Sequence, residues 1–229
     1  MYTEQTESFA KPIRPAASLL LVRDGQNGIE VLTLKRSKRM RFLPGYLAFP
    51  GGTVEASDLS LAKRLVVGCI RGQEQADDAG FALAAIRECA EETGWLCGLR
   101  TGHCELLDES EHGRLLDGPA DWQHSLEARQ QVVAGDALRF IGRWVTPENM
   151  LARFDTRFFL TVARDRFDEF RMSYEENEWV RWNPAGWLLE EIEKGKLLAV
   201  PPTITMLKGI HRLGSPAKCF AELTVPQPV

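Results

Sequence analysis

The sequence predicts a protein of the α/β class, because strand-like and helix-like segments follow one another in mixed order along the chain. Short runs rich in Leu, Val and Ile are bounded by turn residues, whereas other segments show the periodicity of amphipathic helices. Of the 229 residues, 44% are hydrophobic and 26% are charged. This composition is typical of a globular protein with a substantial core.

The first 50 residues predict a tail and three strands. Residues 1–15 are expected to form an extended tail, because two prolines in it disfavour a helix. Ala17–Arg23 and Ile29–Arg36 are apolar and rich in β-formers, and a glycine-containing turn at 24–28 separates them. Tyr46–Phe49 is expected to form a further short strand.

Two helices are expected next. Asp58–Gly72 has an amphipathic pattern. Gly80–Thr93 is rich in Ala, Leu, Ile and Glu, which favour helix formation. Asp77 or Asp78 can cap its start, and Gly94 can end it.

The second half of the chain continues the mixed pattern. Residues 105–136 are polar and rich in Gly and Asp, with a predicted helix at Trp122–Ala134. The predicted strands that follow are Arg139–Val145, Phe158–Arg164 and Glu178–Trp182. The predicted helices are Pro184–Lys194 and Thr203–Leu213, each with a proline near its start.

Composition also excludes several classes of protein. The net charge is −4, from 28 basic and 32 acidic residues, which argues against a dedicated nucleic-acid binder. Five cysteines without a CxxC pair argue against a disulfide framework or a Cys-rich zinc site. No segment approaches the roughly 20 apolar residues that a membrane span needs, and no signal peptide is evident. We therefore expect a cytoplasmic protein with no membrane or nucleic-acid partner.

The most informative segment is an acidic helix face. Glu88, Glu91 and Glu92 stand at positions i, i+3 and i+4, so their carboxylates share one side of the predicted helix. Like charges on adjacent turns repel one another, and a divalent cation would compensate them. Mg²⁺ and Mn²⁺ prefer carboxylate oxygens and also bind substrate phosphates. The pattern indicates a metal site.

Together with an upstream Gly-Gly pair, this segment resembles the signature of the Nudix hydrolase family, Gly-x5-Glu-x7-Arg-Glu-U-x-Glu-Glu-x-Gly-U, where U is apolar. Two features differ from that signature: Asp58 stands at the position of the first Glu, and 28 residues rather than 7 precede Arg87. Asp58, Asp77 or Asp78 could take the part of the missing glutamate. The matching residues are Gly52, Arg87, Glu88, Cys89, Glu91, Glu92, Gly94 and Trp95.

The resemblance implies a fold and a domain plan. The fold would be a Nudix-type α/β/α sandwich with a mixed sheet, forming one domain over residues 16–215. Helical insertions would occupy about 59–79 and 105–136, and residues 216–229 would form a C-terminal tail.

The resemblance also implies roles for the matched residues. Glu88, Glu91 and Glu92 would bind Mg²⁺ or Mn²⁺ with a backbone carbonyl of Gly51 or Gly52, and Arg87 would orient one of the carboxylates. Water would attack one phosphorus of a diphosphate linkage. The general base would be Glu88 or a carboxylate of a downstream acidic loop. The candidates in that loop are Glu175, Glu176 and Glu178, and Glu176 is the one that we assign.

A second motif suggests the substrate. Arg36-Ser37, Arg41, Gly45 and the segment 49–52 resemble the motif of the coenzyme A diphosphatase branch of this family. We therefore expect Arg36, Ser37, Arg41, Gly45 and Gly51 to bind coenzyme A or acyl-coenzyme A, with 3′,5′-ADP and 4′-phosphopantetheine as products. The alternatives are another nucleotide, such as ADP-ribose or NADH, and a non-catalytic nucleotide-binding domain. A homodimer is also an open option.

Overall fold

A computed structural model describes residues 12–117, 122–124, 126, 132–150 and 152–225. Its main sheet is mixed and has the order β12-β3-β2-β1-β10-β9, with β11 also paired to β2 and β4 to β1. The β1–β10 and β12–β3 pairs are parallel, and the other pairs are antiparallel. The strands of this sheet are β1 (Ile13–Gly25), β2 (Gly28–Arg36), β3 (Tyr46–Ala48), β4 (Gly51–Thr53), β9 (Arg139–Val145), β10 (Arg153–Val162), β11 (Asn177–Pro184) and β12 (Leu198–Ala199).

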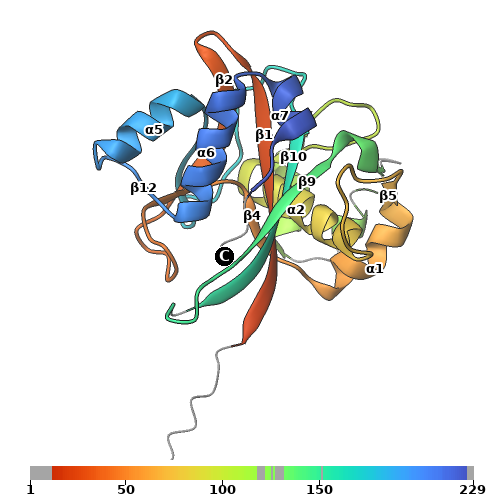
Figure 1. The fold of residues 1–229 in the computed structure, drawn as a ribbon. Helices are drawn as coiled ribbons and strands as arrows, with labels where there is room; N and C mark the ends of the chain where they lie inside the picture. Colours follow the sequence, from red (N-terminus) through yellow and green to blue (C-terminus); the bar gives the residue numbers. More distant parts are fainter. Residues whose placement is uncertain (1–11, 118–121, 125, 127–131, 151, 226–229) are drawn as a thin grey trace, which may run out of the picture.

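Helices cover both faces of the sheet (Figure 1). The helices α1 and α2 lie on one face, and α5, α6 and α7 lie on the other. This arrangement confirms the expected α/β/α sandwich. The helices are α1 (Ala56–Leu65), α2 (Asp78–Thr93), α3 (Glu109–Asp117), α5 (Ala185–Glu193), α6 (Pro201–Leu213) and α7 (Pro216–Glu222).

The central strand β1 explains why the sandwich has two cores. Its side chains alternate between the faces of the sheet. Leu19 and Leu21 belong to the core under α2, whereas Leu20 and Val22 belong to the core under α6. All four side chains are fully buried. Their continuous apolar run is typical of a strand covered by helices on both faces.

Three elements differ from the sequence prediction. Strand β4 was not expected, and it forms because Gly51 and Gly52 pair with β1. Strand β1 begins at Ile13, inside the expected N-terminal tail, and Ile13 pairs with Arg153. Residues 216–222 form α7 instead of a tail, because Cys219 and Leu223 are buried in the same core as the apolar side of α6.

The two expected insertions contact each other. Strand β5 (Val66–Val67) in the first pairs in parallel with β8 (Val133–Ala134) in the second. The predicted helix Asp58–Gly72 is therefore shortened to α1, which ends before β5. The predicted helix Trp122–Ala134 lies partly outside the described residues, and its last two residues form β8 instead.

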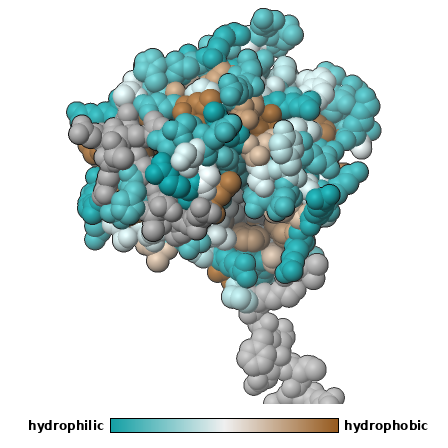
Figure 2. All heavy atoms as spheres, turned by 180° about the vertical axis from the view of Figure 1, so that it is seen from behind, coloured by the Kyte–Doolittle hydropathy of each residue, from teal (hydrophilic) through white to brown (hydrophobic). Residues whose placement is uncertain are grey.

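The surface seen from behind is mostly hydrophilic, and apolar residues appear on it in small separate areas (Figure 2). Among the described residues, no helix combines the length and the apolar character needed to cross a membrane.

Candidate active site

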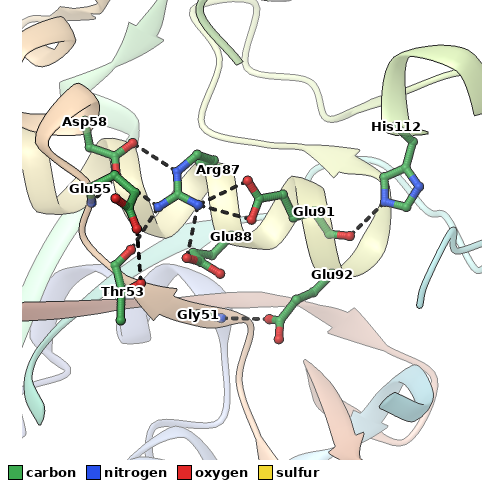
Figure 3. A network of polar contacts seen from close by, with 9 residues as sticks. All are labelled: Gly51, Thr53, Glu55, Asp58, Arg87, Glu88, Glu91, Glu92 and His112. Atoms are coloured by element: carbon green, nitrogen blue, oxygen red, sulfur yellow. Dashed lines mark hydrogen bonds and ion pairs between the residues drawn. The ribbon is translucent and has the colours of Figure 1, made fainter. Parts of the chain in front are cut away.

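Helix α2 presents the acidic residues toward β4 (Figure 3). Its other side packs Leu83, Ile86 and Ala90 into the core, where all three are fully buried. The helix ends at Gly94, whose left-handed conformation (φ 78°) lets its N–H bond to the carbonyl of Ala90. Packing of the apolar side therefore fixes which way the glutamates point.

Arg87 is the centre of the site (Figure 3). Its Nη1 donates to Glu88 Oε1 and to both oxygens of Glu91, each at 3.1 Å. Its Nη2 donates to the carbonyl oxygen of Thr53 at 2.8 Å. The guanidinium thus joins α2 to the end of β4 and holds two carboxylates next to each other.

The same guanidinium binds Asp58 in α1. Arg87 Nε lies 3.1 Å from Oδ1 and Nη2 lies 2.9 Å from Oδ2. Asp77 and Asp78 instead bind Arg157 of β10, with Nη1 distances of 2.8 and 2.6 Å. Asp58 is therefore the aspartate that faces Arg87, and the other two fasten the start of α2 to the sheet.

The expected cap at the start of α2 differs in detail. Asp77 is the residue before the helix, but its side chain makes no capping hydrogen bond. Its carboxylate binds Arg157, and Asp78 accepts from the backbone N–H groups of Glu74 and Gln75. Asp77 therefore forms an ion pair with Arg157 of the sheet and does not cap the helix.

The glycine pair allows the closest approach of β4 to its neighbours. A Cβ on Gly51 would lie 2.5 Å from the backbone oxygen of Ala17, and Gly51 has a φ of 159°. A Cβ on Gly52 would lie 2.4 Å from a carboxylate oxygen of Glu88. The Gly51 N–H also donates to Glu92 Oε2 at 2.9 Å. Both positions therefore exclude a side chain, for different reasons.

The carboxylates are buried and strongly perturbed. Burial raises the pKa of Glu88 to about 7, against the opposing effect of Arg87. Burial likewise raises the pKa of Glu91, and it raises the pKa of Glu92 further, with the charge of Glu88 adding to the effect. For Arg87, burial opposes ionisation, but the bond to Asp58 and the charge of Glu88 hold its pKa above the ordinary value.

This electrostatic arrangement suits a divalent cation. The guanidinium of Arg87 faces the carboxylates of Glu88, Glu91 and Asp58, and Glu92 adds a further carboxylate on α2, so negative charge is in excess. The available donors are hard oxygens, which Mg²⁺ and Mn²⁺ prefer. Within the described part of the chain, no three acidic, His or Cys side chains already converge at metal-binding distances. In this structure Glu88 and Glu91 point to Arg87, and Glu92 points to Gly51.

Of the expected substrate-binding residues, Arg36 ends β2, Ser37, Arg41 and Gly45 lie on the loop that follows it, and Gly51 lies on β4. Arg36 Nε donates to the carbonyl of Phe42 at 3.2 Å, and Gly45, with a φ of 75°, donates its N–H to the carbonyl of Arg36. Ser37 is buried and accepts from the N–H of Arg39, whereas Arg41 is exposed. Arg36 lies near enough to Glu92 to lower its pKa in part.

The acidic loop before β11 separates the three candidate bases. Glu178 pairs with Lys35 at 2.8 Å, and that contact lowers the pKa of Glu178. Glu176 is exposed, and its negative charge contributes to the raised pKa values of Glu91 and Glu92. Its carbonyl accepts from the N–H of Ser37 at 2.7 Å, which ties the acidic loop to the basic loop. Glu176 therefore lies within electrostatic reach of Glu91 and Glu92, whereas Glu178 is paired with Lys35.

His112 was not assigned to the site from the sequence. Its Nε2 lies 2.7 Å from the carbonyl oxygen of Glu91, so α3 contacts the last turn of α2. The sequence pattern of a capping box could have predicted the start of α3, because Asp108 and Glu111 accept each other's backbone N–H groups there. No sequence pattern predicts that the backbone carbonyl of Thr53 accepts a hydrogen bond from Arg87.

The fold agrees with that of known proteins. A family model of the NUDIX domain matches residues 12–191, and the chain therefore belongs to the Nudix family. Together with the helix of glutamates around Arg87, this match defines a Nudix hydrolase domain.

Three individual proteins are similar to this chain over most of its length. A crystal structure of a NUDIX hydrolase from Alicyclobacillus acidocaldarius is 40% identical, with a TM-score of 0.89, and the match covers 94% of this chain and 99% of that one. A Caenorhabditis elegans protein provisionally named nudix hydrolase 7 is 26% identical over 94% of this chain and 66% of its own length. The acyl-coenzyme A diphosphatase NUDT19 of Gallus gallus is 26% identical over 82% of this chain and 65% of its own. The chain thus spans about two thirds of both relatives.

Proposed function

We propose that this protein hydrolyses the diphosphate linkage of coenzyme A or acyl-coenzyme A, giving 3′,5′-ADP and (acyl-)4′-phosphopantetheine. The observation that carries the proposal is the cluster of Glu88, Glu91 and Glu92 around Arg87, next to the basic loop of Arg36. The similarity to an acyl-coenzyme A diphosphatase supports the choice of substrate. Water would attack phosphorus, and the P–O bond of the linkage would break.

The three glutamates would hold Mg²⁺ or Mn²⁺ in the proposed enzyme. A bound divalent cation would neutralise phosphate charge and make the attacking water more acidic. Arg87 keeps the carboxylates of Glu88 and Glu91 close together before any ligand arrives. Gly52 leaves the space that the carboxylate of Glu88 occupies.

Glu176 is the proposed general base. Its carboxylate is exposed and lies within the electrostatic reach of Glu91 and Glu92. It would accept the proton of the attacking water. Glu88, whose pKa is raised to about 7, would remain close to its titration point at neutral pH and is the alternative base.

The basic loop provides the proposed substrate contacts. Five of the seven residues from Lys35 to Arg41 are Lys or Arg. Guanidinium groups bind phosphate oxygens through paired N–H donors, so Arg36 and Arg41 suit the phosphates of the ADP part of coenzyme A. Ser37 and Gly45 shape the loop through their backbone contacts with Glu176 and Arg36.

A substrate screen with product identification tests this function. Purified protein with Mg²⁺ or Mn²⁺ is given coenzyme A, acetyl-coenzyme A, ADP-ribose, NADH and a dinucleoside polyphosphate. We expect metal-dependent 3′,5′-ADP from the first two, and loss of activity in Glu91→Gln. Glu190→Gln is the matched control, because Glu190 is exposed on α5 and pairs with Lys194. Faster turnover of ADP-ribose would reject the coenzyme A assignment, and no turnover at all would favour a binding domain.

A binding measurement separates catalysis from ligand binding. A ligand that binds the folded state raises the melting temperature. We expect Mg²⁺ with coenzyme A to raise it in the wild type and in Glu190→Gln, and to raise it much less in Glu91→Gln. An equal rise in all three proteins would remove Glu91 from the proposed site.

A further inference from the structure

A hairpin directly after α2 brings two cysteines face to face. Strands β6 (Trp95–Leu96) and β7 (Glu105–Leu106) are antiparallel, and Trp95 pairs with Leu106 and Leu96 with Glu105. The same register places Cys97 opposite Cys104, at the point where the loop 98–103 begins and ends. Both thiols are free in the structure.

The hydrogen bonds define the type of this pair. The N–H of Leu107 donates to the carbonyl of Gly94 at 2.9 Å, so Gly94 and Leu107 form a hydrogen-bonded pair. Such pairs alternate with non-hydrogen-bonded pairs along an antiparallel ladder. Cys97 and Cys104 therefore form a non-hydrogen-bonded pair. In agreement, the N–H of Cys104 points away from Cys97 and donates to Asp165 Oδ2 at 3.1 Å.

This type of pair suits a disulfide. The Cα atoms of a non-hydrogen-bonded pair lie about 4.5 Å apart, with the side chains close together. Disulfides span Cα separations of roughly 4.4–6.8 Å, so the strands need little movement to form one. Burial raises the pKa of the Cys97 thiol, and the neighbouring thiols of Cys104 and Cys89 raise it further. Cys89 belongs to a helix turn, where its Sγ lies near Thr93 Oγ1 at 3.8 Å.

The thiols of Cys97 and Cys104 differ in how far solvent and small reagents can reach them. Cys97 is fully buried, whereas Cys104 is half-buried. A hollow of about 140 Å³ borders Cys104, and its other walls include Gly102, Thr161 and Phe220 but not Cys97. A small reagent therefore reaches Cys104 first, and Cys97 is placed to react second.

We propose that Cys97 and Cys104 form a reversible cross-strand disulfide by exchange with a small-molecule disulfide. The thiolate of Cys104 attacks one sulfur of that disulfide, whose S–S bond breaks and releases one thiol. The thiolate of Cys97 then attacks Cys104 Sγ and releases the second thiol. The two protein thiols are oxidised, the small disulfide is reduced to two thiols, and the two protein protons end on them.

Mass analysis after treatment with oxidised glutathione tests the proposal. Trypsin cleaves after Arg100, so the disulfide would join the peptide containing Cys89 and Cys97 to the peptide containing Cys104. We expect this linked pair, together with the loss of two hydrogen atoms from the protein, and its reversal by dithiothreitol. Cys69→Ser is used throughout, because Cys69 is exposed and would react on its own.

Single variants identify the partners. The link should persist in Cys89→Ala and disappear in Cys97→Ala and in Cys104→Ser, while the melting temperature should rise on oxidation only where the link forms. A link that persists in Cys97→Ala would overturn the proposal, as would a stable glutathione adduct on Cys104 in the parent protein. Absence of any reaction at Cys104 would overturn it as well. If Cys97→Ala does not fold, Cys89→Ala decides the partner, because a link that persists in this variant can only join Cys97 to Cys104 and a link that disappears would overturn the proposal.

Discussion

Arg87 and Asp58 are 29 positions apart in the sequence and form a two-point ion pair, with N···O distances of 3.1 and 2.9 Å. Asp58 is fully buried and the side chain of Arg87 is 5% exposed. The pair joins the two halves of the Nudix signature across the inserted segment. Asp58 also accepts the N–H of Glu55 at the start of α1, so it fixes α1 and Arg87 at once.

The first prediction follows from this burial. Asp58→Asn removes the fully buried carboxylate that binds Arg87 at two points and leaves Glu88 and Glu91 as its charged partners, and breaking a buried pair costs roughly 3–5 kcal/mol at most. We expect a loss of unfolding free energy of about that size in urea denaturation, together with reduced hydrolysis. Asp155→Asn is the control, because its pair with Arg143 is partly exposed and should contribute about 1 kcal/mol or less. Similar losses in both variants would contradict the assigned role of Asp58.

The second prediction separates the two glycines of β4. A methyl group on Gly51 would meet the backbone of Ala17 and Ser18, which cannot move without disturbing β1. For a methyl group on Gly52 the nearest atoms are the carboxylate atoms at the end of the flexible Glu88 side chain. We therefore expect Gly51→Ala to lower the melting temperature strongly, and Gly52→Ala to fold well but to lose activity and affinity for Mg²⁺.

Thermal denaturation and Mg²⁺ titration measure these two effects. Gly113→Ala is the control, because no atom lies near the added methyl group and alanine favours a helix over glycine by about 1 kcal/mol. This variant should be as stable as the parent or slightly more so. Full activity of Gly52→Ala would show that Glu88 need not occupy its present position.

The third prediction concerns the start of α2 and its pH dependence. The hydrogen bond from Arg157 holds the pKa of Asp77 below its ordinary value of 3.8. Because the folded-state pKa is lower than the unfolded one, this contribution to stability is complete above pH 3.8 and is lost as the pH falls through the lowered value. In Arg157→Met the pKa of Asp77 should return upward, and stability should fall less steeply in acid.

Carboxyl titration by NMR and urea denaturation at several acidic pH values check this prediction. Arg157→Met should also be destabilised at neutral pH, because Arg157 binds the buried Asp78 and lies 3.6 Å over the ring of Phe81. The exposed Arg212 provides the control variant Arg212→Met. An unchanged titration of Asp77 in Arg157→Met would contradict the assignment.

The sequence predicts those parts of the structure whose signals are local. The helix from Asp78 to Thr93 carries its periodicity and its terminating glycine within 17 residues, and β1 carries an unbroken apolar run. By contrast, β4 has only three residues, two of them glycine, and exists because it pairs with β1. Such pairing is a tertiary contact that no local pattern contains.

The residues of the site also divide into those that a local pattern predicts and those that depend on tertiary contacts. Spacing on α2 predicts that Glu88, Glu91 and Glu92 share a face, but it leaves Asp58, Asp77 and Asp78 open as candidates for the missing glutamate of the signature. The choice depends on how the inserted segment folds, because that segment places Asp77 and Asp78 beside Arg157. The C-terminal helix α7 was missed although Ser215 caps it and Pro216 begins it, a recognisable start signal.

The last prediction concerns the end of α2. The N–H of Trp95, which would continue the helix, binds Thr93 Oγ1, so the carbonyl of Glu91 receives the Nε2–H of His112 instead. His112 is buried, and its removal would leave this carbonyl without its partner, at a cost of roughly 1–3 kcal/mol. We expect His112→Ala to lose about that much unfolding free energy and to bind Mg²⁺ more weakly, because the carboxylate of Glu91 belongs to the same turn. His103→Ala is the control, since His103 is exposed and pairs with Asp165. Equal effects of the two substitutions on Mg²⁺ affinity would show that α3 does not position the site.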